Sequence, residues 1–150
     1  MENVLRTIVA PIAIVLAVQT VTAFATCAHG YNRKNVHIEH PWTPAKPTAP
    51  NADVVIFMTI KNSSRSADRL QRVESREAAR VEIHGASGEI SERGLVIPPG
   101  VNIAMKPNGA HLRLIGLKKD LIPYDTIAVE LIFERAGRIR IDIIVDELPM

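Results

Sequence analysis

The sequence predicts an all-β domain, a sandwich or a barrel, from three observations. Apolar and polar residues alternate along two neighbouring runs, 127–133 and 139–145, as in strands with one buried face. Turn-forming residues separate short apolar segments along the rest of the chain. No window carries a convincing helical stripe, and 75–79 is the one weak candidate. Many short strands joined by turns are typical of sandwiches and barrels.

Each expected strand lies between turn signals. The candidates, in order, are 36–39, 54–61, 69–73, 80–84, 101–105, 111–115, 127–133 and 139–145. Segment 43–52 has three prolines and no periodicity, which predicts an extended loop. The sequences Pro-Pro-Gly at 98–100, Pro-Asn-Gly at 107–109 and Ile-Pro-Tyr-Asp at 122–125 each precede a strand. Ala136-Gly137 lies between the last two runs and predicts a hairpin.

Residues 1–28 are expected to be a secretory signal peptide, which leaves a single domain over 29–150. Residues 8–25 are nearly all apolar, and cleavage signals end at Ala25 and at Ala28. Export from a bacterium would place the mature chain in the periplasm. A retained membrane anchor is the alternative, because the apolar run approaches the length needed to span a bilayer. Lipid attachment at Cys27 is a weaker alternative, since Phe24 and Thr26 fit its usual context poorly.

Composition excludes several classes of function. The chain has 150 residues, 47% of them hydrophobic and 23% charged, which is typical of a globular domain. A net charge of +2 with scattered Lys and Arg, and 4% aromatic residues, argue against a nucleic-acid partner. Cys27 is the only cysteine, so no internal disulfide can form, and its removal would exclude a thiolate ligand or nucleophile. No phosphate loop or nucleophile motif is present, so we do not expect an enzyme.

Two histidines are the candidate metal ligands, His84 in the strand 80–84 and His111 at the start of 111–115. The apolar residues Ile83 and Leu112 take the core face of these strands, so both histidines should point away from the core. Imidazole binds copper and zinc well. Two outward histidines on different strands are also common without any metal, and a solvated surface pair is the alternative reading of the spacing.

Other possible ligands are weaker candidates. Met105 shares its alternation with Val101 and Ile103, so a place in the core is expected for it and for Met58. His37 and His40 are three residues apart, which puts them on opposite faces of a strand. His29 would chelate Cu(II) with the terminal amine only if cleavage follows Ala28. Trp42 is expected to pack against the end of the sandwich.

Several stretches resemble one family. They are His-Ile-Glu-His-Pro-Trp at 37–42, Phe-Met-Thr-Ile-Lys-Asn at 57–62, Ala-Asp-Arg-Leu at 67–70, Val-Glu-Ile-His at 81–84, Pro-Asn-Gly-Ala-His-Leu at 107–112, Gly-Leu-Lys at 116–118 and Leu-Ile-Phe-Glu at 131–134. Their order and spacing, over about 36–145, resemble the PCuAC-type periplasmic copper chaperones. The resemblance implies a cupredoxin-like β-sandwich that assists copper delivery to respiratory cytochrome oxidase. Its partners would be periplasmic proteins that donate or receive copper.

The same resemblance implies His84 and His111 as the metal ligands and identifies what is missing. The family's ligands are a His, a Met after it, and a later His-x-Met. Arg113 stands at the last Met position, and 85–97 contains no methionine. Thioethers suit Cu(I), whereas Arg has no lone pair to offer. Two histidines, with water or Glu89, would still hold Cu(II) or Zn(II). The alternative is a divergent member that no longer binds Cu(I) and acts as an interaction or assembly module.

Overall fold

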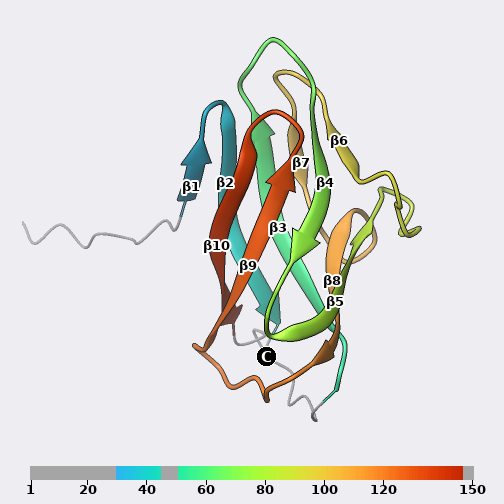
Figure 1. The fold of residues 1–150 in the computed structure, drawn as a ribbon, viewed down its shortest axis with the longest axis vertical. Helices are drawn as coiled ribbons and strands as arrows, with labels where there is room; N and C mark the ends of the chain where they lie inside the picture. Colours follow the sequence, from blue (N-terminus) through green and yellow to red (C-terminus); the bar gives the residue numbers. More distant parts are fainter. Residues whose placement is uncertain (1–29, 45–50, 147–150) are drawn as a thin grey trace, which may run out of the picture.

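The computed structural model describes residues 30–44 and 51–146, and it confirms the all-β prediction (Figure 1). The strands are β1 (Gly30–Arg33), β2 (Val36–Pro44), β3 (Val54–Asn62), β4 (Asp68–Glu74), β5 (Ala78–His84), β6 (Leu95–Ile97), β7 (Asn102–Ala104), β8 (His111–Leu117), β9 (Thr126–Phe133) and β10 (Gly137–Asp146). Within these ranges no helix has the length and apolar character to cross a membrane. The expected signal peptide, 1–28, and His29 lie outside the described residues.

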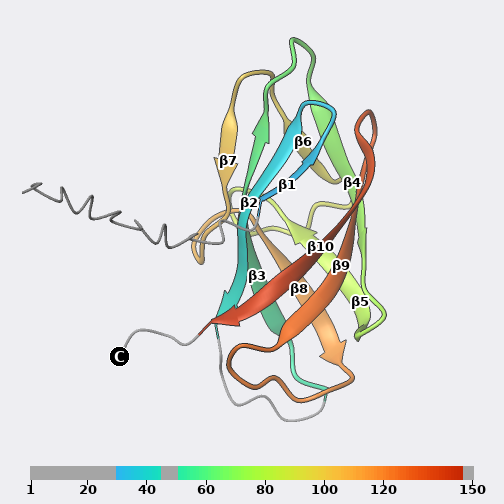
Figure 2. The same ribbon diagram turned by 90° about the vertical axis from the view of Figure 1, so that its left-hand side faces the viewer.

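Strand β3 connects the two layers of the sandwich because its two halves pair with different partners. Residues 54–56 lie antiparallel to β8, whose other neighbour is β5. The later half of β3 pairs with β2 and with the short β7. From β2 the larger sheet continues through β10, β9, β4 and β6 (Figures 1 and 2). The path of strands, which begins with β5 and β8 and ends with β4 and β6, therefore curls around one core.

Strand β2 is longer than the sequence predicted. We expected it to end near Glu39, just before Pro41 and Trp42. The strand instead continues through a bulge between Glu39 and Trp42, where His40 adopts a φ of 48°. Beyond the bulge β2 pairs in parallel with β10. Trp42 lies inside the strand and packs against Phe57, with ring centroids 5.1 Å apart.

Alternating side chains from both layers form the core. The runs in β9 and β10 bury every second residue, and the hairpin between them forms as predicted. The largest fully buried side chains are Ile38, Ile56, Ile60, Leu70, Ile97, Leu112, Leu114, Leu117, Ile127, Leu131, Ile141 and Ile143. Met58 and Met105 are buried, as expected.

The predicted alternation over 101–105 is wrong, because Val101 is 42% exposed and only 102–104 form β7. The weak helical candidate at 75–79 is also wrong, since β5 already begins at Ala78.

Asp68 joins β4 to the β9–β10 hairpin. Its carboxylate accepts hydrogen bonds from the backbone N–H groups of Arg69, Arg135 and Ala136, at 2.7, 2.9 and 2.9 Å. The residue is only 6% exposed. A buried carboxylate is tolerated where such donors replace the hydrogen bonds of its lost water. Here the carboxylate holds the turn between β9 and β10 in place.

Candidate metal centre

His84 and His111 lie directly opposite each other on β5 and β8. They are partners in the antiparallel register. The neighbouring residues Ile83 and Leu112 point into the core, so the two histidines lie on the opposite face of the strand pair. The two imidazole rings stack with centroids 4.4 Å apart and planes inclined by 15°. The structure thus brings together the two histidines that the sequence placed separately on outward faces.

A short loop after β5 covers His84. Backbone hydrogen bonds close it: Gly85 N–H donates to Glu89 O and Ser91 N–H to Ile83 O, both at 2.8 Å. Gly88 permits the turn with a φ of 82°, a conformation that glycine adopts without a steric cost. His84 is 7% exposed as a result, while His111 is partly exposed. The alternative of a solvated surface pair is therefore wrong for His84.

The hydrogen bonds of the two rings select one nitrogen on each. Nδ1 of His84 lies 2.8 Å from Gly88 O, and Nδ1 of His111 lies 2.8 Å from Gly109 O. A carbonyl oxygen only accepts, so both Nδ1 atoms donate. This arrangement leaves Nε2 as the nitrogen that a metal would bind on each ring, as second-shell hydrogen bonds do in known metal sites. On His84 the ion would replace the proton that Nε2 shares with Glu82.

A carboxylate accompanies the histidine pair. Glu82 lies two residues before His84 on the same face, and its Oε2 is 3.2 Å from Nε2 of His84. The hydrogen bond from Arg80 lowers the pKa of Glu82 below its ordinary value; burial opposes this shift, and the hydrogen bond with His84 adds to it. The carboxylate therefore stays ionised next to the ring.

Arg113 is directed away from the histidines. Its guanidinium donates to Asp53 Oδ2 at 2.8 Å, and Asp53 stands immediately before β3, on the other side of β8 from β5. The same carboxylate accepts from Gly116 N–H at 3.3 Å. The positive charge that the sequence placed near the metal position is thus paired with Asp53, on the β3 side of β8.

The remaining candidates lie apart from this pair. Glu89 turns back to accept a hydrogen bond from Ser87 N–H at 3.1 Å. His37 contacts Asn32 Oδ1 at 2.7 Å and Ser63 Oγ at 3.1 Å, which gives both its ring nitrogens partners other than His40. Over 30–44 and 51–146, no three His, Cys, Asp or Glu side chains already converge on one point.

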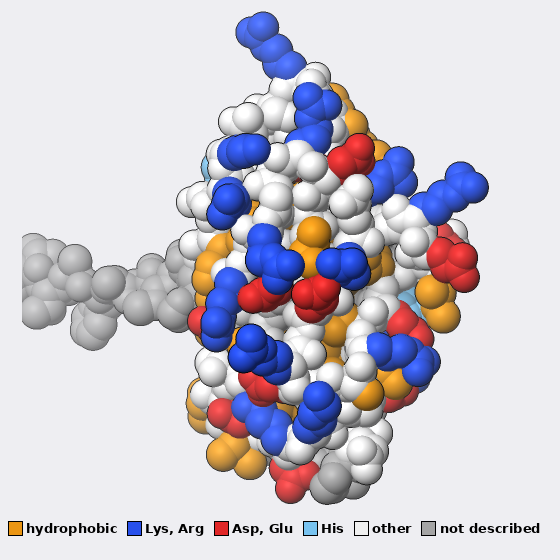
Figure 3. Space-filling model, viewed as in Figure 1, with side chains coloured by type: hydrophobic (Ala, Val, Ile, Leu, Met, Phe, Trp, Pro, Cys, Tyr) orange, Lys and Arg blue, Asp and Glu red, His pale blue; other side chains and the backbone are white. Residues whose placement is uncertain are grey.

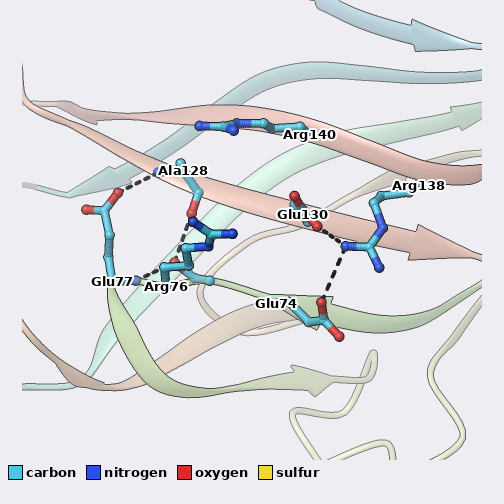
Figure 4. A pocket seen from close by; sticks show the side chains of 8 residues that line it. Glu74, Arg76, Glu77, Ala128, Glu130, Arg138 and Arg140 are labelled. Atoms are coloured by element: carbon cyan, nitrogen blue, oxygen red, sulfur yellow. Dashed lines mark hydrogen bonds and ion pairs between the residues drawn. The ribbon is translucent and has the colours of Figure 1, made fainter.

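A hollow of about 520 Å³ lies in the other layer, over β4 and β9 (Figure 4). Its lining is mainly ionic: Glu74, Ser75, Arg76, Glu77, Ala128, Glu130, Arg138 and Arg140. Arg138 pairs there with both Glu130 and Glu74. This face of the molecule mixes acidic and basic side chains (Figure 3). The hollow shares no residue with the histidine pair, so we assign it to a surface ion-pair network.

Solved structures with the same architecture define the class of protein. The copper-bound PCuAC domain from PmoF2 is 31% identical, with 80% of this chain and 99% of that chain covered and a TM-score of 0.70. The apo PCuAC domain from PmoF1 is 29% identical, with 80% and 100% covered and a TM-score of 0.74. Cu(I)-DR1885 from Deinococcus radiodurans, at 18% identity, coverage of 83% and 85% and a TM-score of 0.62, supports the fold. The class is a cupredoxin-like copper-chaperone domain, not a known class of enzyme.

Within this class the chain belongs to the LpqE-like family. Residues 36–145 match the family model described as "Putative lipoprotein LpqE-like". The search among curated proteins gave no match to this chain. The family resemblance and the cupredoxin-like fold that it implied are thereby confirmed.

Proposed function

We propose that this protein is an exported copper chaperone that binds its metal through His84 and His111. One observation supports this most strongly: the two histidines that the sequence resemblance implies as ligands stack directly across β5 and β8. Both rings have Nδ1 bonded to a backbone carbonyl, so Nε2 is the nitrogen that each ring keeps for a metal. Copper here is cargo, and the work of the protein is to hold it and release it.

Transfer would proceed by exchange of ligands with a partner protein. His111 is partly exposed, whereas His84 lies beneath the loop that Gly88 helps to form. A partner's ligand can therefore approach from the His111 side while His84 still holds the ion. The family resemblance makes a copper centre of respiratory cytochrome oxidase the recipient that we propose.

Competitive copper titration of the mature protein tests the proposal. We expect one equivalent of copper to bind, and His84→Ala and His111→Ala each to abolish stoichiometric binding. His37→Ala is the matched control, because His37 also lies on a strand but both its ring nitrogens have polar partners away from the site. Binding that is indifferent to both site mutations, or no binding at all, would contradict the proposal.

A second candidate is a divergent member that no longer binds Cu(I) and acts as a periplasmic interaction or assembly module. Arg113 favours this candidate. It stands at the family's thioether position, offers no lone pair to a metal, and is paired with Asp53. The titration distinguishes the two candidates, since a module of this kind would be folded and would not bind the metal.

We also propose that the chain is exported and that its mature part functions in the periplasm. The apolar run over 8–25 and the cleavage signals at Ala25 and Ala28 support export. Mass spectrometry of the protein recovered from the periplasm would locate the cleavage site. A mass that includes an acyl group, lost in Cys27→Ser, would instead establish the lipid-anchored alternative.

A further inference from the structure

The carboxylate of Glu82 occupies the position nearest to the metal-facing nitrogen of His84. Antiparallel pairing puts Glu82 opposite Arg113 and His84 opposite His111, so all four side chains share one face of the β5–β8 pair. Glu82 has a side chain only 15% exposed, and its Oε2 lies 3.2 Å from Nε2 of His84. Its other oxygen, Oε1, is 2.9 Å from the guanidinium of Arg80. One oxygen is therefore held in place by Arg80, and the other faces the histidine.

The distance between these two atoms suits two adjacent ligands of one ion. Two donors that each lie about 2.0 Å from a metal and 3.2 Å from each other subtend an angle of about 106° at it. This value lies between the square-planar and the tetrahedral angle. An ion that replaces the hydrogen bond between Glu82 and His84 can thus bind both without a shift of strand β5.

His111 would complete a set of three donors. Its ring already stacks on that of His84, and a rotation of the side chain that releases Nδ1 from Gly109 O would turn Nε2 toward the same ion. The stacked rings present their faces to each other, and they would have to separate before a copper ion could lie in line between two opposed nitrogens. Linear two-coordinate binding by the histidines alone is thus disfavoured.

The donors present are hard or borderline. The described methionines, Met58 and Met105, are 2% and 6% exposed and belong to the core. The position of the family's last thioether is Arg113, whose charge is paired with Asp53. Imidazole and carboxylate suit Cu(II), whereas Cu(I) is selected by thioether and thiolate. The negative charge of Glu82 also offsets part of the charge of a divalent ion.

We infer that Glu82 is a third metal ligand beside His84 and His111, and that the site prefers Cu(II) to Cu(I). This inference rests on the proposed function and names the oxidation state of its cargo. It assigns to Glu82 a role at the metal that the family's two-His, two-Met pattern does not contain.

Titration with Cu(II), and with Cu(I) under reducing conditions, tests the inference on wild-type protein and Glu82→Gln. We expect Glu82→Gln to lower the affinity for Cu(II) by about tenfold or more and to change the Cu(II) hyperfine coupling in the EPR spectrum, with the Cu(I) affinity unchanged. Glu89→Gln is the matched control, a carboxylate in the neighbouring loop that bonds only to Ser87 N–H in the described structure. Glu82→Asp keeps a carboxylate and should keep part of the Cu(II) affinity.

Wild-type EPR parameters and affinities retained in Glu82→Gln would overturn the role of Glu82 while leaving the histidine site intact. A tighter affinity for Cu(I) than for Cu(II) in the wild-type protein would overturn the preference. Absence of binding by either ion would contradict the proposed function itself. Equal losses for both ions in Glu82→Gln would indicate a structural role and also overturn the inference.

Discussion

Replacing Arg113 by methionine should raise the affinity for Cu(I) by about tenfold or more, the scale on which even outer-shell groups change metal binding. The substitution removes a cation from the neighbourhood of the site and restores a soft donor at the family's thioether position. Arg113 and His111 lie two residues apart on the same face of β8, so a thioether at 113 is within reach of an ion held by the histidine.

The structure indicates that this substitution costs little stability. Arg113 forms its ion pair with Asp53 at 2.8 Å, and the two side chains are 43% and 36% exposed. Pairs as exposed as this contribute about 0.2–1 kcal/mol, so the free energy of unfolding should fall by no more than about 1 kcal/mol. A tenfold gain in Cu(I) affinity corresponds to about 1.4 kcal/mol of binding free energy, which is larger than the expected loss in the free energy of unfolding.

Competition with a Cu(I) chelator measures the gain, and urea unfolding measures the cost. Arg113→Leu is the control, because it removes the guanidinium and adds no donor. We expect the Cu(I) affinity to be highest for Arg113→Met, lower for Arg113→Leu and lowest for the wild-type protein. Equal affinities for Met and Leu would show that the thioether does not reach the ion. No gain in either variant would refute the reasoning, since neither charge nor donor at 113 would then limit binding.

Two further predictions concern stability and pH. Asp68→Ala leaves buried backbone N–H groups without an acceptor and should lower the free energy of unfolding in urea by about 3 kcal/mol. Asp142→Ala, on an exposed position of β10, should change it by less than about 0.5 kcal/mol, and similar losses in the two variants would contradict this account. The carboxyl of Glu82 should titrate by NMR below its ordinary pKa of 4.5, and Arg80→Ala should raise that pKa. Because the folded-state pKa is lowered, the stabilisation by Glu82 is present above about pH 4.5 and is lost as the pH falls through the lowered pKa. An unchanged Glu82 pKa in Arg80→Ala would show that Arg80 is not the main cause of the lowered pKa.

Local patterns in the sequence were sufficient for the class of fold. Alternation over 127–133 and 139–145 predicted β9, β10 and their hairpin, since a strand with one buried face must alternate. The same rule placed His84 and His111 on the face away from the core. The continuation of β2 beyond Glu39 was not predicted, because the bulge before Trp42 forms only against the partner strand β3.

What the sequence by itself determined is therefore the all-β class, the face of each histidine and the absence of a methionine over 85–97. Only the tertiary structure decided that His84 pairs with His111, because a shift of register by one residue would turn either side chain to the other face. It alone decided that the guanidinium of Arg113 is held by Asp53, 60 residues away in the chain. Contacts of this kind arise from strands that meet only in the folded sheet, and no local periodicity encodes which residues they bring together.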